Sequence, residues 1–390
     1  MEFDGYKIAR YRPEFKKQIA QLQTELWSSD VELNAAYFEW KHERNPYSRE
    51  PLVYVALSEG QVVGMIGLVP TKWEVGNPKR TLFALAACDT TIDPAHRNRA
   101  LFTRMFDVAI RDLATSAFEF MYCMSASRIS RLSLLMTGWQ NVGSLEWGLW
   151  QPFPRIRRLA RRVPVLKAVR ASVEGIQLSP ADLTRRRAAD RGPFEGLDRN
   201  AVRQTHKFRE HISVSRTPRV DAMEALVKRS RTDDRYRFTR DRDYFAWRFK
   251  NPRSRYRFLY WDDEVLQGYL VLEWSTDLQG KQGRHVRILD WQAANSGVLV
   301  DMVQATINRG NFPVLTIWSV TLEDDTKKAL GNAGFAFMDQ EEARRREQYV
   351  EALLVKPIRA EAGAVDTASV NRSWSDMANW DLRQSFSDDH

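Results

Sequence analysis

The sequence has few cysteines and no long apolar run. Cys88 and Cys123 are the only cysteines in 390 residues, too few for a disulfide scaffold and without the spacing of a metal site. We therefore predict a reduced, cytoplasmic protein without a bound metal. No stretch of about 18 apolar residues occurs, which argues against a membrane-spanning helix. Residues 1–15 lack the apolar segment of a signal peptide.

Acidic residues are fewer than basic ones, and the net charge is +9. This excess is compatible with a phosphorylated cofactor, RNA or an anionic membrane surface, and it selects none of them. Apolar residues make up 43% of the chain, enough to build a core. The length exceeds that of one ordinary domain, so we expect two domains and a tail.

Strand and helix patterns alternate in the first part of the chain. Apolar runs predict strands over 52–57, 62–69, 82–88 and 118–124, the first two joined as a hairpin. The third has no polar face, so we expect it to be covered on both sides. A helical apolar stripe follows at Phe102, Met105, Phe106, Ala109 and Leu113. A second helix is predicted to end at Gly138, before a last strand. The order is that of a mixed α/β fold.

Two segments share a motif. "AYFEWKHERNP" (36–46) and "DYFAWRFKNP" (243–252) both read Tyr-Phe-x-Trp-basic and then Asn-Pro; we call them the Tyr-Phe-x-Trp segments. Each precedes a predicted hairpin, and each half closes with a helix that ends in Gly-aromatic. We interpret this as a duplicated domain and expect Trp40 and Trp247 to pack under their own sheets.

The expected organisation has four parts. They are an N-terminal domain (1–150), a basic linker (151–200), a C-terminal domain (201–355) and a tail (356–390). We expect this tail to be flexible or loosely docked through Trp374 and Trp380. The linker is rich in arginine and poor in apolar residues, which favours an exposed connecting segment. Peripheral contact of this linker with a membrane stays an open alternative.

The stretch "DPAHRNRALF" (93–102) lies between a buried strand and an apolar helix. In this context, backbone N–H groups of the turn and of the first helical residues point at one spot, where the helix dipole adds positive character. Arg97 and Arg99 add full charges. The stretch therefore predicts a pyrophosphate-binding loop.

These features together resemble the GCN5-related N-acetyltransferase (GNAT) family. The order is strand, basic loop, helix, strand, and then Ser-x-x-Ser before Gly-Trp. The resemblance implies two tandem GNAT-like domains, each a mixed sheet with flanking helices, and acetyl-CoA as acyl donor. It implies that the donor is held by Arg97, Asn98, Arg99, Ala100, Leu101 and Phe102 at the pyrophosphate, by Thr91 and Ile92 at the thioester and pantetheine, and by Ser127 and Ser130. Ala100 and Phe102 replace small residues of the family's loop.

The resemblance also directs the search for catalytic groups. Many members carry a tyrosine as general acid four residues before the Gly-aromatic pair, but this sequence has Leu134 there. Tyr122 on the preceding strand is our candidate acid, and Asp89 at the end of strand 82–88 is our candidate base. His42 is a further candidate base. Attack by an amine that binds already deprotonated needs no base at all.

The second half lacks an arginine loop after "RILDW" (287–291), so we expect it not to bind CoA. It resembles the C-terminal half of tandem GNAT proteins encoded among surface-polysaccharide genes, through Asp241, Tyr244, Trp247, Arg248, Pro252 and Tyr256. The resemblance implies transfer of acetyl to the amine of a small molecule such as an amino sugar. Two alternatives stay open. One is a Fem-like transferase that uses aminoacyl-tRNA, the only reading with a nucleic-acid partner; the other is a non-catalytic binding protein.

Overall fold

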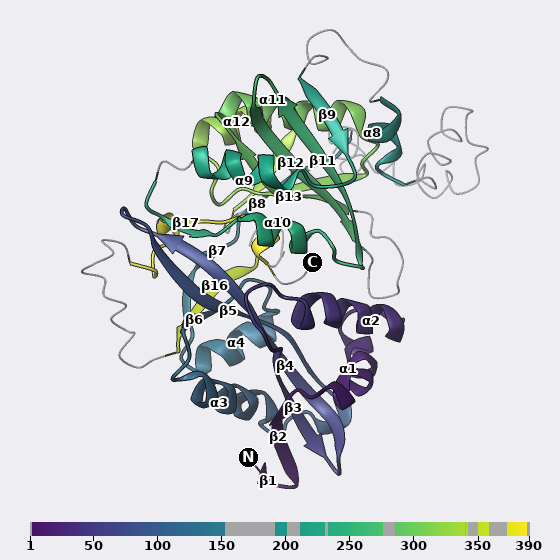
Figure 1. Ribbon diagram of the computed structural model, residues 1–390, viewed down its shortest axis with the longest axis vertical. Helices are drawn as coiled ribbons and strands as arrows, with labels where there is room; N and C mark the ends of the chain where they lie inside the picture. Colours follow the sequence, from purple (N-terminus) through teal and green to yellow (C-terminus); the bar gives the residue numbers. More distant parts are fainter. Residues whose placement is uncertain are drawn as a thin grey trace, which may run out of the picture.

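The computed structural model describes residues 2–152, 192–200, 211–230, 233–275, 285–339, 341, 350–358 and 373–387. Most of the predicted basic linker lies outside these residues. The described chain forms two mixed sheets with flanking helices, one in the lower and one in the upper half of Figure 1. The predicted α/β fold class is thereby confirmed, and the arrangement is consistent with two tandem GNAT-like domains. No described helix is both long and apolar enough to cross a membrane.

The first sheet contains the strands that the sequence pattern predicted. Its order is β1 (Glu2–Phe3), β2 (Tyr6–Arg10), β3 (Leu52–Ser58), β4 (Gln61–Val75), β5 (Arg80–Ile92), β6 (Phe118–Cys123), β16 (Ala352–Pro357) and β7 (Gln140–Ser144). Strand β10 (Tyr236–Phe238) joins the end of β4, and β17 (Trp380–Asp381) pairs with β10. Strands β5 and β6 run parallel, as expected when a helix connects them.

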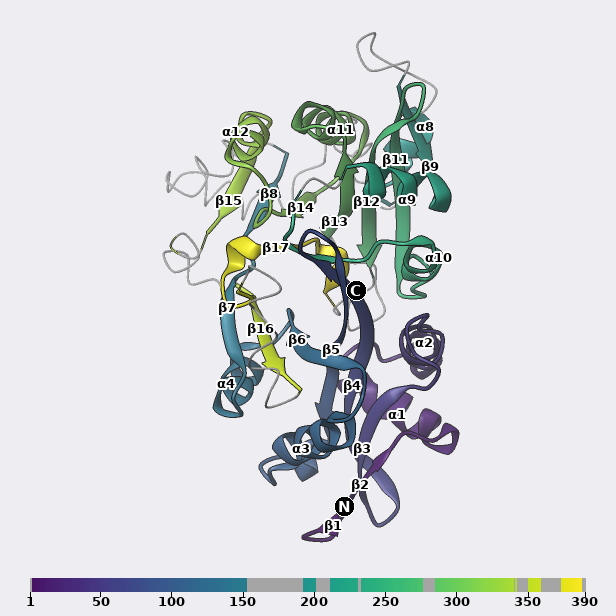
Figure 2. The ribbon, with the colours of Figure 1, turned by 60° about the vertical axis from the view of Figure 1, so that its left-hand side comes forward.

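Helices cover both faces of this sheet. Figure 2 shows α1 (Lys16–Leu22) and α2 (Val31–Phe38) on one side, and α3 (Leu101–Leu113) and α4 (Arg128–Met136) on the other. Alternate residues of β3 pack on the two sides: Val53 and Val55 toward α1 and α2, Leu52 and Tyr54 toward α3. Strand β5 is accordingly buried on both faces, as its apolar sequence predicted.

The second sheet has the order β15 (Phe335–Met338), β8 (Trp147–Trp150), β14 (Val314–Trp318), β13 (His285–Ala293), β12 (Leu266–Ser275), β11 (Ser254–Asp262) and β9 (Ile212–Ser215). Its helices are α8 (Glu195–Asn200), α9 (Val220–Arg229), α10 (Arg242–Arg248), α11 (Ser296–Arg309) and α12 (Asp324–Asn332). The predicted hairpin after the second Tyr-Phe-x-Trp segment is β11–β12. Strands β13 and β14 are the parallel pair, at the position that β5 and β6 hold in the first sheet.

The two halves exchange one strand each. Strand β8 precedes residue 151 but lies in the second sheet, between β14 and β15. Strand β16 comes from the C-terminal part of the chain but lies in the first sheet, between β6 and β7. The domain boundaries expected at 150 and 355 therefore do not follow the sheets. Each sheet is completed only when the other half of the chain is present.

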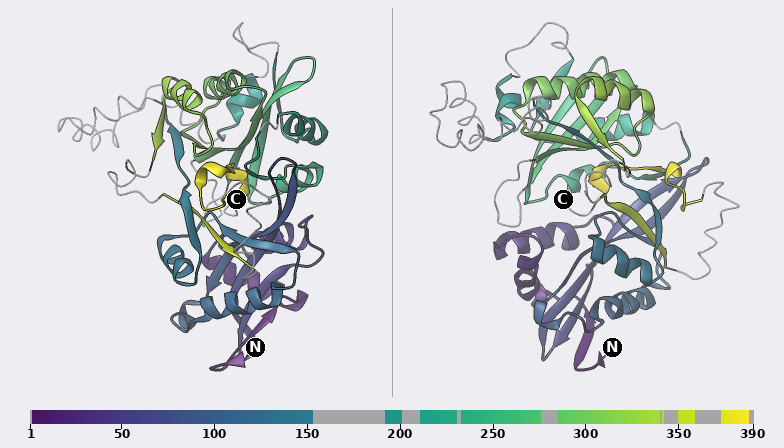
Figure 3. Two further views of the ribbon diagram at one scale, coloured as in Figure 1. Left: turned by 90° about the vertical axis from the view of Figure 1, so that its left-hand side faces the viewer. Right: turned by 180° about the vertical axis from the view of Figure 1, so that it is seen from behind.

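The C-terminal segment is docked between the halves, as the left view of Figure 3 shows. Trp380, Leu382 and Phe386 are buried in the core cluster that also holds Trp73 of the first sheet and Tyr269 of the second. Of the two expectations for the tail, docking through Trp374 and Trp380 is confirmed for residues 373–387, and flexibility is wrong for them. Large apolar side chains in a polar segment lose contact with water here because both sheets supply a partner surface.

Candidate functional site

The ladder between β5 and β6 ends inside the first sheet. Pairing runs from Phe83 opposite Phe118 to Ala86 opposite Tyr122. Beyond that point the β5 residues 87–92 continue the described ladder only with β4. Thr91 and Ile92, predicted to hold the thioester and pantetheine, lie on this stretch. An exposed strand edge can pair with the backbone-like amides of an extended ligand.

The loop after β5 forms a cradle at the start of α3. Ala100 has φ +56°, in the left-handed region, and directly precedes the first helical residue, Leu101. This alternation of backbone hand turns successive N–H groups toward one concavity, and the first helical N–H groups have no acceptor within the helix. Asn98 is also left-handed, with φ +62°. A left-handed backbone at Ala100 explains why the resembling family uses glycine there.

The arginines of the loop are exposed to solvent. Arg97 donates from Nε to the carbonyl oxygen of Ile92 at 3.1 Å and lies 3.8 Å from a carboxylate oxygen of Glu25. Arg99 is exposed as well. Leu101 is buried, and the half-buried Phe102 packs on Phe106 with ring centroids 5.0 Å apart. Phe102 therefore packs its side chain against the core, where it does not prevent use of the loop amides.

Ser127 and Ser130 begin helix α4. The hydroxyl of Ser127 accepts a hydrogen bond from the backbone N–H of Ser130 at 3.2 Å, and the two hydroxyl oxygens lie 2.9 Å apart. This is an N-terminal cap, which needs no ligand to explain it. Their contact with a donor stays a prediction. Leu134 is buried on the same helix, so no acid stands at the position where many family members have tyrosine.

Asp89 lies at a β-bulge and is fully enclosed. Its φ is +50°, and the register between β4 and β5 shifts there. Its carboxylate accepts hydrogen bonds from Lys41 Nζ at 2.9 Å, from the Trp27 indole at 3.1 Å and from His42 Nε2 at 2.7 Å. Burial alone would raise the pKa of Asp89, but the Lys41 charge and the His42 hydrogen bond outweigh it and hold the pKa well below its usual range.

A π-helical turn brings Lys41 and His42 to this carboxylate. Residues Glu39–Glu43 (η3) form this turn, and the N–H of Arg44 donates to the carbonyl oxygen of Glu39, five residues earlier. A π turn holds one more residue than an α turn. It therefore accommodates the extra residue that distinguishes segment 36–46 from segment 243–252.

His42 combines a bound and an unbound ring nitrogen. Donation to a carboxylate places the proton on Nε2, while Nδ1 is buried without a hydrogen-bond partner among the described residues. Burial lowers the pKa of His42, so its imidazole is neutral at pH 7. The ring lies directly over Gly67, where a Cβ atom would come within 2.6 Å of Cε1.

Tyr122 lines a small inner cavity of about 30 Å³, together with Ala86, Lys41 and the C-terminal residues 385–387. Its hydroxyl lies 3.5 Å from the carbonyl oxygen of Phe386. This cavity therefore reaches the point where β5 and β6 part. The structure brings Tyr122 and the Asp89 cluster to the same region, since Lys41 belongs to both.

The expectation that Trp40 and Trp247 pack under their own sheets is wrong. Their rings stack on each other at 5.2 Å and 14°. Each indole N–H donates to the other residue's carbonyl oxygen, at 2.9 and 2.8 Å. The two Tyr-Phe-x-Trp segments thus meet face to face between the halves. The shared motif was the available signal for this contact, but the sequence does not say that its two copies would touch.

In the second sheet, the region beyond the end of the parallel ladder is occupied by the chain itself. The β13–β14 ladder ends at Ile288 opposite Ile317. Just beyond, the carbonyl oxygen of Trp291 accepts from Arg240 at 3.0 Å and from Arg383 at 3.3 Å, and the Arg383 guanidinium lies 3.7 Å from the Trp291 ring centroid. The chain's own C-terminal segment therefore occupies the edge of β13.

Comparison with known proteins agrees with this fold. Residues 7–131 match the model of a family described as "Acetyltransferase (GNAT) domain", so the chain contains a GNAT acetyltransferase domain. No curated protein matches the sequence. A GCN5-related N-acetyltransferase from Anabaena variabilis ATCC 29413 has a similar structure, with TM-score 0.56 and 10% identity. So does a conserved protein of unknown function from Enterococcus faecalis V583, titled a probable N-acyltransferase, with TM-score 0.56 and 9% identity. Each similarity covers 92% of this chain and 74% of the other chain, and at such identities it concerns the fold alone.

Proposed function

We propose that this GNAT-domain protein is an acyl-CoA-dependent N-acyltransferase that transfers acetyl from acetyl-CoA to the amine of a small molecule, such as an amino sugar. One observation carries the proposal: an exposed, arginine-flanked cradle at the start of α3 directly follows the stretch of β5 that lies beyond its ladder with β6. The cradle suits a pyrophosphate. The strand edge suits an extended arm that contains amides.

Most of the predicted donor-binding residues have a place in this proposal. Arg97 and Arg99 would neutralise the pyrophosphate, and the amides from Ala100 to Phe102 would bind its oxygens. The backbone of Thr91 and Ile92 would hold the arm and the thioester carbonyl. When bound, acetyl-CoA supplies a thioester that is already reactive, so positioning accounts for much of the rate.

We assign proton acceptance to His42 and a positioning role to Asp89. The low pKa of Asp89 makes its carboxylate a weak base, and three donors already occupy it. His42 donates from Nε2 to Asp89, which leaves the Nδ1 lone pair to take a proton from the amine through a water. As the nitrogen–carbon bond forms and the carbon–sulfur bond breaks, the amine loses one proton and the sulfur gains one. Tyr122 stays our candidate donor for that second proton.

Calorimetric titration of acetyl-CoA tests the cradle. We expect micromolar binding to the wild type and a loss of about tenfold or more in Arg97→Glu/Arg99→Glu, because the charge reversal repels a pyrophosphate. The matched control is Lys327→Glu/Lys328→Glu on α12, which changes the net charge equally and lies on a helix that packs against the other sheet. No binding by the wild type would refute the proposal, and tRNA would then be the next ligand to titrate.

Kinetics test the assignment of His42. His42→Gln should lower kcat/KM by about 10²–10⁴-fold and remove its rise with pH below neutrality, while the acetyl-CoA affinity stays unchanged. Asp89→Asn should shift this pH profile without abolishing it. An unaltered profile in His42→Gln would show that the amine binds already deprotonated or that another base acts.

A further inference from the structure

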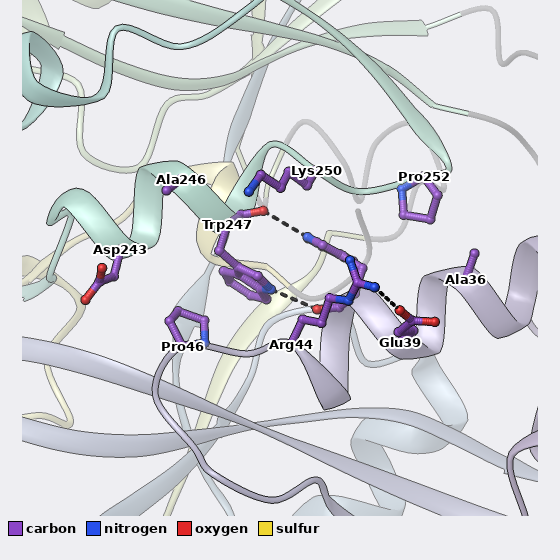
Figure 4. A pocket seen from close by; sticks show the side chains of 10 residues that line it. Ala36, Glu39, Arg44, Pro46, Asp243, Ala246, Trp247, Lys250 and Pro252 are labelled. Atoms are coloured by element: carbon purple, nitrogen blue, oxygen red, sulfur yellow. Dashed lines mark hydrogen bonds and ion pairs between the residues drawn. The ribbon is translucent and has the colours of Figure 1, made fainter. Parts of the chain in front are cut away.

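A pocket of about 390 Å³ lies where the two Tyr-Phe-x-Trp segments meet (Figure 4). Equivalent positions of the two segments line it: Ala36 with Asp243, Glu39 with Ala246, and Trp40 with Trp247. Its volume is typical of small-molecule sites, which span about 300–1,000 Å³. This outer pocket is thus large enough for an acceptor molecule.

The inner cavity is too small to bind an acceptor molecule. Its volume of about 30 Å³ leaves room for about one or two water molecules. The stacked indoles of Trp40 and Trp247 line both the outer pocket and the inner cavity. The tryptophan pair therefore borders the outer pocket on one side and, on the other, the cavity that Ala86 and Tyr122 line at the end of the β5–β6 ladder.

The charges of the outer pocket indicate what it binds. Glu39 is already bonded to Lys16 and Arg44. The side chains of Asp243 and Lys250, by contrast, have no hydrogen-bond or ion-pair partner among the described residues, and both are exposed. Figure 4 places them at opposite ends of the short helix that carries Trp247. One free carboxylate and one free ammonium are complementary to a molecule that bears both an amine and an anionic group.

We propose that the outer pocket is the acceptor-binding site, that it selects amines carrying an anionic group through Lys250 and Asp243, and that Trp40 and Trp247 part to admit the amine. This inference rests on the acyl transfer proposed above. It adds the class of acceptor and the route by which the acceptor reaches the donor.

The test titrates D-glucosamine and D-glucosamine 6-phosphate into the full-length protein with CoA present. The two sugars differ only in the anionic group, so we expect the phosphate to tighten binding by about tenfold, the worth of one hydrogen bond between charged groups. Lys250→Gln should abolish this difference. Lys328→Gln, which alters an exposed lysine on α12, should leave it intact.

A second variant tests the location. Ala246→Trp fills the outer pocket and should abolish binding of both sugars, while titration of acetyl-CoA stays unchanged. Val265→Trp, at an exposed position in the β11–β12 turn, is the control. Equal affinity for the two sugars, no binding of the 6-phosphate, or unchanged binding in Ala246→Trp would overturn the inference. Failure of acetyl-CoA itself to bind the wild type would instead overturn the proposed function.

Discussion

Replacing Lys41 by methionine should destabilise the protein strongly and in a pH-dependent way. The Lys41 ammonium lies 2.9 Å from the Asp89 carboxylate, and neither side chain is more than 3% exposed. Methionine keeps the apolar stem but leaves a buried carboxylate without its nearest cation. Removing one partner of a buried ion pair costs about 3–5 kcal/mol.

The sign of the pH dependence follows from the pKa of Asp89. In the wild type this pKa lies below that of the unfolded chain, so the ion pair stabilises the protein above the unfolded value, and the contribution is lost only at strongly acidic pH. In Lys41→Met, burial dominates and raises the pKa of Asp89 above the unfolded value. The variant therefore gains stability relative to the wild type as the pH falls, because the buried carboxylate becomes protonated.

Denaturant unfolding at about pH 8 and about pH 5 measures both effects, because an aspartate in the unfolded chain stays ionised at either pH. We expect the gap between Lys41→Met and wild type to narrow at the lower pH. Asp89→Asn and the double variant complete a cycle that isolates the pair. Lys16→Met is the control, since Lys16 pairs with Glu39 near the surface. This substitution should lower the free energy of unfolding by no more than about 1 kcal/mol. A loss below about 1 kcal/mol in Lys41→Met, independent of pH, would refute the reasoning.

Three further substitutions test other parts of the structure. Ala100→Gly should keep or raise thermal stability and acetyl-CoA affinity, whereas Ala100→Val should lower both, because a left-handed backbone costs a side chain about 1–2 kcal/mol. Gly67→Ala should lower the free energy of unfolding by about 1–3 kcal/mol, since its Cβ would clash with the His42 imidazole. Gly64→Ala should not lower it, because its Cβ would lie 3.4 Å from its nearest neighbour. Trp380→Ala should lower the free energy of unfolding by about 3–5 kcal/mol. A change near zero in urea unfolding would show that the tail is not docked.

The sequence predicted the parts of the site that are contiguous along the chain. The cradle occupies residues 93–102, and its flanking strand and helix were readable from apolar spacing, because a periodic pattern reflects which face is buried. Helix α3 and the hairpins were confirmed for the same reason. The left-handed backbone at Ala100 was not predicted, since the resemblance implied only that a small residue belongs there.

The Asp89 cluster could not be predicted in the same way. Lys41 and Asp89 are far apart in the sequence, and neither residue has a neighbouring motif that points to the other. Their pairing depends on the π-helical turn and on the β-bulge, both of which are local irregularities without a periodic signal. Because these partners were unknown, we predicted Asp89 as a candidate base, although they give it a low pKa.

The sequence by itself determined the local elements, the basic loop at the start of α3 and the likeness between the two Tyr-Phe-x-Trp segments, because these follow from residue types at short spacing. Only the tertiary structure decided that β8 and β16 exchange sheets, that the C-terminal segment fills the edge of β13, and that Trp40 stacks on Trp247. Each of these contacts joins residues distant along the chain. Their free energy comes from surfaces that exist only after both halves have formed, so no local pattern records them.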